Sequence, residues 1–416
     1  MSECFVVHKF GGSCLRENSD IDKIANIIQS SDGKPVVVVS ALWGVTDKLL
    51  RALKDVQYSG KIVQDLISQH LIFAPEIEDG PFFGLFQRVI DGISNEIMKL
   101  SSGGPRSQKS ENLILASGER LSALVVAQKL RNLGIEANPI GAEDIGLIMK
   151  GSGKSKEIDL EKSKSSLKFD MLTGLPILTG WFGQGSDGEL AILSRGGSDH
   201  SAAAFANLLN AKKLILWKDV DGIKPINPRW GIETKSIPYL GYGQASELAI
   251  HGTNVIHPAT LFPLVKLGIP VEINNIHEPK LIPPTIIGPD LNTQELIAIG
   301  CQPGVSLITD ENTINSELIS LIESKDVVPW HLESDNNSMK LILPNQFVRK
   351  YQKHFSGTIE HKSAIITIIG KHRKLGSNFQ FVNKNDFGTR YLVTTNNLAI
   401  EIAELYYSLF SLQDCR

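Results

Sequence analysis

Residues 4–13 read CFVVHKFGGS, and this stretch decides the fold. Its segment from Cys4 to Phe10, mostly apolar, is typical of a short buried strand, which ends at the glycine pair Gly11-Gly12. Apolar residues at 21, 24, 25 and 28 then recur at helical spacing, and residues 35–39 (PVVVV) form the β-branched run of a strand covered on both faces. Strand, glycine turn, helix and strand in this order predict the opening of a parallel α/β domain.

The same alternation continues along the chain. Residues 60–110 are expected to be helical, and a long helical pattern follows from Glu111 to Leu133. The Ser/Lys-rich stretch from Lys150 to Lys168 is interpreted as a surface loop. Further strands are predicted at residues 135–140, 176–180, 214–217 and 270–274.

Four prolines occur from Pro279 to Pro289, and the pattern of predicted elements changes after them, so we place a domain boundary there. Beyond Thr293 two amphipathic helices are predicted, at residues 315–325 and 399–410, and residues 371–378 are interpreted as a loop. Short strands are predicted at residues 296–300, 305–309, 340–343, 364–369 and 391–394. The prediction is therefore two parts, residues 1–285 and a smaller α+β region at residues 293–416.

Composition excludes several classes of protein. The chain has 416 residues, 42% hydrophobic and 21% charged, which is ordinary for a globular enzyme and long enough for about two or three domains. A net charge of −3 does not indicate nucleic-acid binding. No segment reaches the roughly 18 unbroken apolar residues of a membrane span, and no signal peptide is expected. The cysteines at 4, 14, 301 and 415 lack metal or redox spacing, so a reduced cytoplasmic setting is predicted.

Three glycine-centred segments are suited to holding a ligand. Lys9 precedes Gly11-Gly12, where backbone N–H groups can approach phosphate oxygens closely. Arg195 and Asp199 flank a second glycine pair at the start of a helical pattern, and the Arg fork suits a carboxylate or phosphate. Residues 217–224 (WKDVDGIK) follow a strand, as at a nucleotide-binding edge. Taken alone, each segment also fits a plain turn with solvated charges. Residues 151–155 are not a Walker A loop, because Ile148 stands where its first glycine belongs.

Taken in order, these segments resemble those of the aspartate kinases, a group within the amino acid kinase superfamily. The resemblance spans residue 5 to about residue 275, and the C-terminal remainder resembles the paired ACT modules of that family more weakly. The segments that carry it are residues 9–13 (KFGGS), 117–122 (SGERLS), 195–199 (RGGSD), 217–223 (WKDVDGI), Pro228-Arg229 and 252–260 (GTNVIHPAT). It implies an amino acid kinase fold, with a largely parallel central sheet sandwiched by helices, followed by smaller ACT-like modules.

The resemblance also implies a reaction, in which the γ-phosphoryl group of Mg-ATP moves to the side-chain carboxylate of L-aspartate. Lys9 would be the cation at the transferring phosphoryl group, with Gly11 and Gly12 as backbone donors. Asp199 would orient Lys9 or the substrate ammonium. It is not assigned as a general base, because a carboxylate nucleophile is already ionised at neutral pH.

The remaining site residues follow from the same resemblance. Arg195 would bind the α-carboxylate of aspartate and Glu119 its α-ammonium, and Ser40 and Thr46 would border substrate and phosphate. Gly196, Gly197 and Ser198 would complete the substrate site. The residues implied to bind ATP are Lys218, Asp219, Lys224, Arg229, Asn254 and Val255. The chain departs from the family's pattern where Lys218 replaces a small hydroxyl residue, Lys224 a tyrosine, Asn254 a lysine and Ser117 a histidine.

Partners and alternatives complete the sequence-based hypothesis. Magnesium is expected to be held by ATP oxygens and water, with no protein ligands assigned. A homodimer through the C-terminal region is expected, and lysine or threonine is the candidate feedback effector. A kinase of another small acidic amino acid, such as glutamate, is one alternative. A catalytically weak amino-acid-binding regulatory protein of the same fold is the other.

Overall fold

The structure is a computed structural model in which two compact units are distinguished. Unit 1 comprises Met1–Gly222 and Ala259–Gly288, and unit 2 comprises Ile223–Pro258 and Pro289–Arg416. The domain boundary predicted between residues 285 and 293 stays a prediction, and here residues 223–258 group with the C-terminal part. The structure describes residues 4–102, 106–151, 156–194, 196–252, 255–279, 283–291, 295–310, 316–324, 327, 329–334, 339–355, 357–372 and 374–410.

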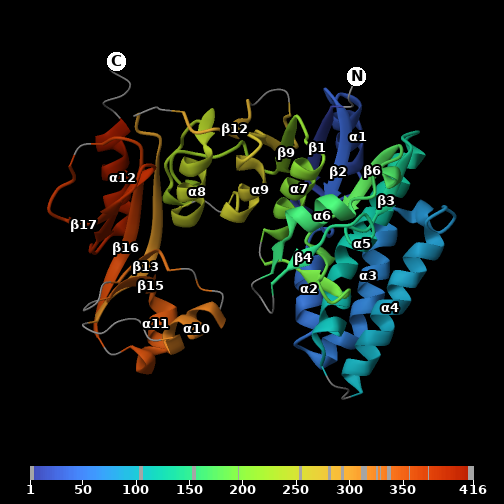
Figure 1. The fold of residues 1–416 in the computed structure, drawn as a ribbon, viewed down its shortest axis with the longest axis horizontal. Coiled ribbons are helices and arrows are strands. Elements are labelled where there is room, and N and C mark those ends of the chain that lie inside the picture. The colour runs from blue at the N-terminus through green and yellow to red at the C-terminus, as the bar shows by residue number, and fades with distance from the viewer. Residues whose placement is uncertain are drawn as a thin grey trace. The chain divides into compact units, whose positions relative to one another are not determined.

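The core of unit 1 is a sheet in the order β12-β11-β9-β1-β2-β6-β3 (Figure 1). Neighbours from β11 to β3 run parallel, and β12 is antiparallel to β11. The predicted, largely parallel sheet is confirmed, although β12 in the proline-rich stretch was not predicted. The strands are β1 (Phe5–Phe10), β2 (Lys34–Val39), β3 (Ala137–Ile140), β6 (Leu175–Thr179), β9 (Lys213–Lys218), β11 (Val271–Asn275) and β12 (Thr285–Gly288).

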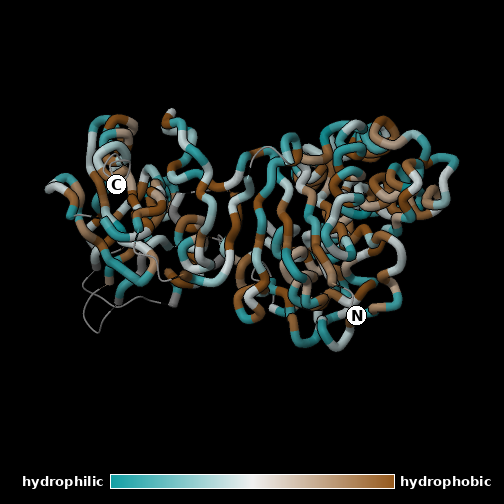
Figure 2. Tube along the Cα trace, turned by 90° about the horizontal axis from the view of Figure 1, so that it is seen from above, coloured by the Kyte–Doolittle hydropathy of each residue, from teal (hydrophilic) through white to brown (hydrophobic). Residues whose placement is uncertain are grey.

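Helices cover both faces of this sheet. Val6 and Phe10 of β1 pack in one apolar cluster with residues of α1 and α5. Because side chains alternate along a strand, Val7 and Lys9 face the other side, which α7 covers. Figure 2 shows hydrophobic stretches along the strands that cross this unit, as expected for a sheet buried on both faces. The helices of unit 1 are α1 (Asp20–Gln29), α2 (Val45–Ala52), α3 (Val56–Phe73), α4 (Phe83–Ser101), α5 (Gln108–Asn132), α6 (Leu160–Ser166), α7 (Gly197–Leu208) and α9 (Phe262–Val265).

The loop predicted from Lys150 to Lys168 is wrong in its second half, because α6 lies there. The carboxylate of Asp159 caps this helix by accepting a hydrogen bond from the backbone N–H of Lys162 at 3.1 Å, and Ser163 is buried. The Asp159 cap and the buried Ser163 therefore stabilise a helix in a segment whose composition is typical of a loop. Short strands pair nearby as two hairpins, β4 (Met149–Lys150) with β5 (Glu157–Ile158) and β7 (Phe182–Gln184) with β8 (Leu190–Ile192).

Unit 2 is built on an antiparallel sheet in the order β14-β15-β13-β16-β18-β17. The predicted α+β character of the C-terminal part is confirmed, and the described residues between β16 and β18 contain strand β17 and no helix. The strands of this sheet are β13 (Ala298–Asp310), β14 (His331–Ser334), β15 (Met339–Pro344), β16 (Thr358–Ile369), β17 (Phe379–Lys384) and β18 (Gly388–Val393), and unit 2 also contains the short strand β10 (Tyr239–Gly241), which is not part of this sheet. The helices are α8 (Tyr242–His251), α10 (Ser316–Ser324), α11 (Asn345–Lys350) and α12 (Leu398–Phe410).

Strand β13 corrects the prediction of two separate strands at residues 296–300 and 305–309. It runs unbroken through Pro303, which is paired with β16. Its pairing with β15 begins only at Val305, so the missing N–H of Pro303 faces no strand on that side.

The segment Ile223–Pro258 is attached to this sheet by specific contacts within unit 2. The Arg229 guanidinium donates to the Cys301 carbonyl at 2.8 Å, and Ile226 forms a bridge with Ile299. On α8, Glu247 forms a buried ion pair with Arg390 of β18 at 2.5 Å. Among the described helices of the chain, none combines the length and apolarity needed to cross a membrane.

Candidate active site

A buried lysine and a half-buried one share one carboxylate at the carboxyl ends of the parallel strands in unit 1. The Nζ atom of Lys9 lies 2.6 Å from Oδ1 of Asp199, and the Nζ atom of Lys218 lies 2.7 Å from Oδ2 of the same residue. The Lys9 and Asp199 side chains are 6% and 8% exposed, whereas that of Lys218 is 18% exposed. The cluster is thus dry at its centre and opens toward solvent on the Lys218 side.

Strand register explains why these residues meet. Lys9 lies opposite Leu216 where β1 pairs with β9, so Lys218 follows two residues later on the same face of the sheet. Helix α7 covers that face, and Asp199 is the third residue of this helix. Gly196 caps the helix at φ 76°, a conformation in which a side chain would be strained. The two predicted glycine turns, far apart in the sequence, therefore converge.

Electrostatics in this cluster follow from burial and from the two ammonium groups. Burial alone would raise the pKa of Asp199, but the charges of Lys218 and Lys9 outweigh it and lower that pKa below its usual range. Burial lowers the pKa of Lys9, and the contact with Asp199 opposes that shift. Two ammonium groups against one carboxylate leave a surplus of positive charge, so the site is suited to an anion.

The glycine turn after β1 leaves room beside Lys9. A Cβ atom at Gly11 would lie 3.3 Å from the Nζ atom of Lys9, and one at Gly12 would lie 3.1 Å from the carbonyl oxygen of Ala41. The backbone N–H of Ser40 donates to the Phe10 carbonyl at 3.1 Å, which ties the ends of β1 and β2 together. The structure thus places Gly11, Gly12 and Ser40 around Lys9. Thr46, the second residue of α2, is half-buried.

Glu119 projects from α5 toward the end of β2. Its Oε1 atom accepts a hydrogen bond from the backbone N–H of Ala41 at 3.2 Å, whereas its Oε2 atom is buried without a partner among the described residues. The side chain approaches closely because the neighbouring residue is Gly118, where a Cβ atom would lie 3.0 Å from that of Ala41. Burial raises the pKa of Glu119 to about 8. A buried carboxyl group with a free acceptor is suited to a cationic group.

The start of α7 packs against the end of β6. A Cβ atom at Gly180 would lie 2.7 Å from that of Ser198, and one at Gly197 would lie 2.5 Å from Cδ1 of Trp181. Trp181 adopts φ 72°, which is rare for a side chain of this size. Its backbone N–H donates to Oγ of Ser201 at 3.1 Å. Trp181 was not predicted, because its immediate neighbours in the sequence do not signal a strained backbone. Arg195 lies outside the described residues.

The residues implied for nucleotide binding divide between the two units. Lys218 belongs to the cluster above, and Asp219 pairs with Arg16 at 2.8 Å near the surface of unit 1. In unit 2, Arg229 donates to Cys301 and its guanidinium lies 4.9 Å from the Trp230 ring centre. Lys224 and Val255 are half-buried in unit 2, and Asn254 lies outside the described residues.

Comparisons with known proteins agree with this geometry. The amino acid kinase family matches residues 5–275. Aspartokinase 3 of Bacillus subtilis is 25% identical over 396 residues, which cover 88% of this chain and 86% of that protein. The chloroplastic aspartokinase 3 of Arabidopsis thaliana is 26% identical over 95% of this chain and 76% of its own length. The crystal structure of E. coli aspartokinase III with aspartate and ADP has the same fold, with a TM-score of 0.81 at 21% identity over 98% of this chain and 100% of that one.

Proposed function

Because the chain belongs to the amino acid kinase family, we propose that it is an aspartate kinase. It transfers the γ-phosphoryl group of ATP to the side-chain carboxylate of L-aspartate, and the products are 4-phospho-L-aspartate and ADP. The observation that carries this proposal is the Asp199 carboxylate held between Lys9 and Lys218 at the start of α7. The aspartokinase relatives, which match this chain over most of its length, support the choice of substrate.

This reaction mainly requires that the negative charge of the two reactants is compensated and that the reactants are aligned. An anionic carboxylate must approach an anionic triphosphate, and the nucleophile needs no general base because it is ionised at neutral pH. Lys9 and Lys218 supply positive charge in a site largely closed to water, where such charge acts most strongly. Asp199 orients both ammonium groups, and the backbone N–H groups of Gly11 and Gly12 donate to the phosphoryl oxygens.

Recognition of aspartate needs one cationic and one anionic partner. We assign the α-ammonium to Glu119, whose Oε2 atom has no hydrogen-bond partner among the described residues. We assign the α-carboxylate to Arg195 on the basis of the family resemblance. Ser40, Thr46, Gly196, Gly197 and Ser198 border the substrate in this scheme.

The nucleotide and its magnesium ion fit the residues that are present. The glycine turn leaves the space beside Lys9 that a phosphate needs, and Lys218 extends the positive charge toward solvent. Asp219, Lys224, Arg229, Asn254 and Val255 are assigned to ATP from the resemblance. A bound Mg²⁺ ion would neutralise part of the negative charge of the phosphates. Because no group of three acidic, His or Cys residues that could bind a metal occurs in the described part of the chain, we assign its ligands to phosphate oxygens and water.

The wider setting follows from this activity. We propose that the enzyme supplies the first step of lysine or diaminopimelate, threonine and methionine synthesis in the cytoplasm, with free cysteines at Cys4, Cys14 and Cys301. We also propose a homodimer through an ACT-like C-terminal region and feedback by lysine or threonine. E. coli aspartokinase III has been crystallised with lysine and aspartate, which supports an amino acid as effector.

The activity is tested by trapping the acyl phosphate with hydroxylamine. Incubation with ATP, Mg²⁺ and L-aspartate is expected to yield aspartyl hydroxamate, and L-glutamate in place of aspartate is the control for another acidic substrate. A hydroxamate signal with glutamate alone would assign the enzyme to that substrate. Binding of aspartate without ATP binding or product would instead favour a regulatory protein.

Aspartate binding is expected to depend on pH through Glu119. With a pKa of about 8, this carboxyl group is mostly protonated at pH 7 in the free enzyme, whereas the substrate ammonium requires the ionised form. The KM for aspartate should therefore fall as the pH rises from 6.5 to 8.5. Calorimetry in two buffers with different ionisation enthalpies should show release of a proton on binding. Glu119→Gln should raise KM by about 10–100-fold and remove the pH dependence.

The control for this prediction is Glu189→Gln, because the Glu189 side chain is 44% exposed and lies in a surface ion pair. It should keep both the KM of the unaltered enzyme and its pH profile. A Glu119→Gln enzyme with an unchanged aspartate profile would remove Glu119 from the substrate site.

Lys218 gives a further expected result, because this lysine is a departure from the family's pattern. Lys218→Met should lower kcat/KM for ATP by about 10–100-fold, since one of two charges facing the phosphates is lost. Steady-state kinetics at saturating aspartate measures the effect. Lys213→Met, at the start of the same strand and paired there with Glu272, is the matched control. Equal kinetics of the two variants would contradict a role for Lys218.

A further inference from the structure

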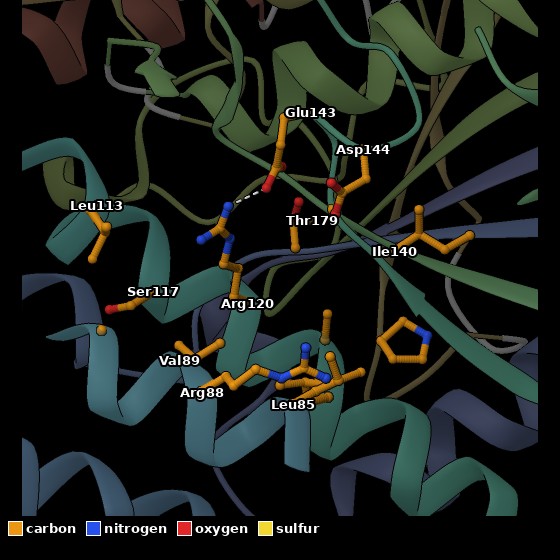
Figure 3. A pocket seen from close by; sticks show the side chains of 15 residues that line it. Leu85, Arg88, Val89, Leu113, Ser117, Arg120, Ile140, Glu143, Asp144 and Thr179 are labelled. Atoms are coloured by element: carbon orange, nitrogen blue, oxygen red, sulfur yellow. Dashed lines mark hydrogen bonds and ion pairs between the residues drawn. The ribbon is translucent and has the colours of Figure 1, made fainter. Parts of the chain in front are cut away.

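Unit 1 contains a cavity of about 340 Å³ between helices α4 and α5 and the ends of strands β3 and β6 (Figure 3). Its volume is at the lower end of the range of small-molecule sites. Lys9, Glu119, Asp199 and Lys218 are not among its lining residues. The cavity is therefore separate from the cluster to which the phosphoryl transfer is assigned.

The polar side of the cavity presents opposite charges next to each other. Arg120 of α5 donates a hydrogen bond to Oε1 of Glu143, which follows β3, and Asp144 lies beside this pair (Figure 3). The Oε2 atom of Glu143 is buried and has no hydrogen-bond partner among the described residues. The Arg120 guanidinium carries five N–H donors, of which this contact uses one. Both members of the pair thus keep unused hydrogen-bonding capacity.

The rest of the lining is largely aliphatic. Leu85 and Val89 of α4 face Leu113 and Leu124 of α5, and Ile140 of β3 closes one side. Leu85 is 40% exposed, whereas Leu124 and Ile140 are buried, so the part of this lining that the chain leaves open to water lies on the α4 side. Covering it would remove apolar area from water, which is favourable. Arg88 adds a positive charge on the α4 side, opposite the carboxyl groups of Glu143 and Asp144 (Figure 3).

We propose that this cavity is a second amino-acid site, which binds a free α-amino acid with an aliphatic side chain. The ammonium group would bind Glu143, whose terminal torsion is soft enough to turn Oε2 toward it. The carboxylate would bind the free N–H groups of Arg120 or Arg88, and the side chain would lie against the leucines and Ile140. This site goes beyond the proposed kinase reaction and does not depend on it.

Charge selects this ligand class over simpler ones. A lone anion in the cavity would face the carboxylates of Glu143 and Asp144, and a lone cation would face Arg88 and Arg120. An α-amino acid carries both charges on one carbon atom, and it can match an adjacent Arg120–Glu143 pair with each. The remaining volume and the aliphatic wall then favour a hydrocarbon side chain over an acidic one.

A cavity-filling variant provides the test. Gly92 of α4 lines the cavity, and a Cβ atom there would meet only Leu113 at 3.8 Å, so Gly92→Leu fills the space without a backbone clash. Gly60→Leu is the matched control, because Gly60 lies in the interior of α3 with open space around it. Titration calorimetry of the full chain with L-leucine, in saturating L-aspartate, should show binding that Gly92→Leu weakens at least tenfold and Gly60→Leu leaves unchanged.

Two ligand analogues test the charge assignment. Leucinamide lacks the carboxylate and 4-methylpentanoate lacks the ammonium, and each should bind at least tenfold more weakly than L-leucine. Should Gly92→Leu fail to fold by circular dichroism, Leu85→Trp narrows the cavity from a partly exposed position instead. No binding of L-leucine to the unaltered chain, or equal binding by the filled and control variants, would overturn the proposal. Neither result bears on the hydroxamate assay, so the two proposals fail independently.

Discussion

Lys9→Met is expected to lower kcat/KM by about 10³-fold or more, which corresponds to roughly 4 kcal/mol of transition-state stabilisation. The ammonium group is buried beside the place where the phosphoryl group would transfer, and no water can replace its charge there. Methionine keeps the unbranched shape of the side chain, so the loss is one of charge and not of packing. The hydroxamate assay at varied ATP and aspartate concentrations measures the effect.

Lys212→Met is the control for this substitution, because the Lys212 side chain is 50% exposed and pairs with Asp32 at the surface. It is expected to keep full activity. A Lys9→Met enzyme with near-normal turnover and a normal circular dichroism spectrum would show that another group compensates the phosphoryl charge.

Asp199→Asn is expected to have the second large effect, on stability as well as on turnover. It leaves two ammonium groups side by side without their counter-charge, and breaking a buried pair in this way typically costs about 3–5 kcal/mol. Urea unfolding at pH 7 measures the loss, and activity should fall because Lys9 and Lys218 are no longer held.

The pH dependence of this loss distinguishes a charge effect from a packing effect. The pKa of Asp199 is lowered in the folded state, so its stabilisation is present above the unfolded pKa of about 4 and is lost as the pH falls below it. The stability difference between the parent chain and Asp199→Asn should therefore be constant from pH 7 to about pH 5 and shrink in more acidic solution. A difference that stays constant through pH 3 would contradict the ionic role of Asp199.

The sequence predicted the central sheet well because its strands carry strong local signals. Residues 35–39 are continuously apolar and residues 4–10 are apolar except for His8 and Lys9, as expected of strands buried on both faces. Strand β12 and helix α6 were not predicted, since prolines flank the first and mostly polar residues form the second, where the Asp159 cap and the burial of Ser163 favour a helix. Two strands were predicted where β13 is one, and Pro303 is tolerated inside it because its pairing with β15 begins only at Val305.

The sequence predicted the residues of the candidate site better than the contacts between them. Residue types around the glycine pairs pointed to Lys9 and Asp199, and their contact at 2.6 Å supports the expectation that Asp199 orients Lys9. The contact of Lys218 with the same carboxylate depends on the register between β1 and β9, which no local pattern reveals. The strained backbone of Trp181 likewise arises from its packing under α7 and not from its neighbours in the sequence.

The grouping of Ile223–Pro258 with the C-terminal sheet has a practical consequence for anyone shortening the gene. The polypeptide passes from one unit to the other after Gly222, returns after Pro258 and leaves again after Gly288, so no single cut separates the two. An expression clone that stops at residue 288 would keep Ile226, Arg229 and Glu247 but discard Ile299, Cys301 and Arg390, with which they pair. A separately produced catalytic fragment would therefore need Ile226 and Glu247 redesigned for solubility, whereas the segment as a whole would have to stay because it carries Lys224 and Arg229, which are assigned to ATP.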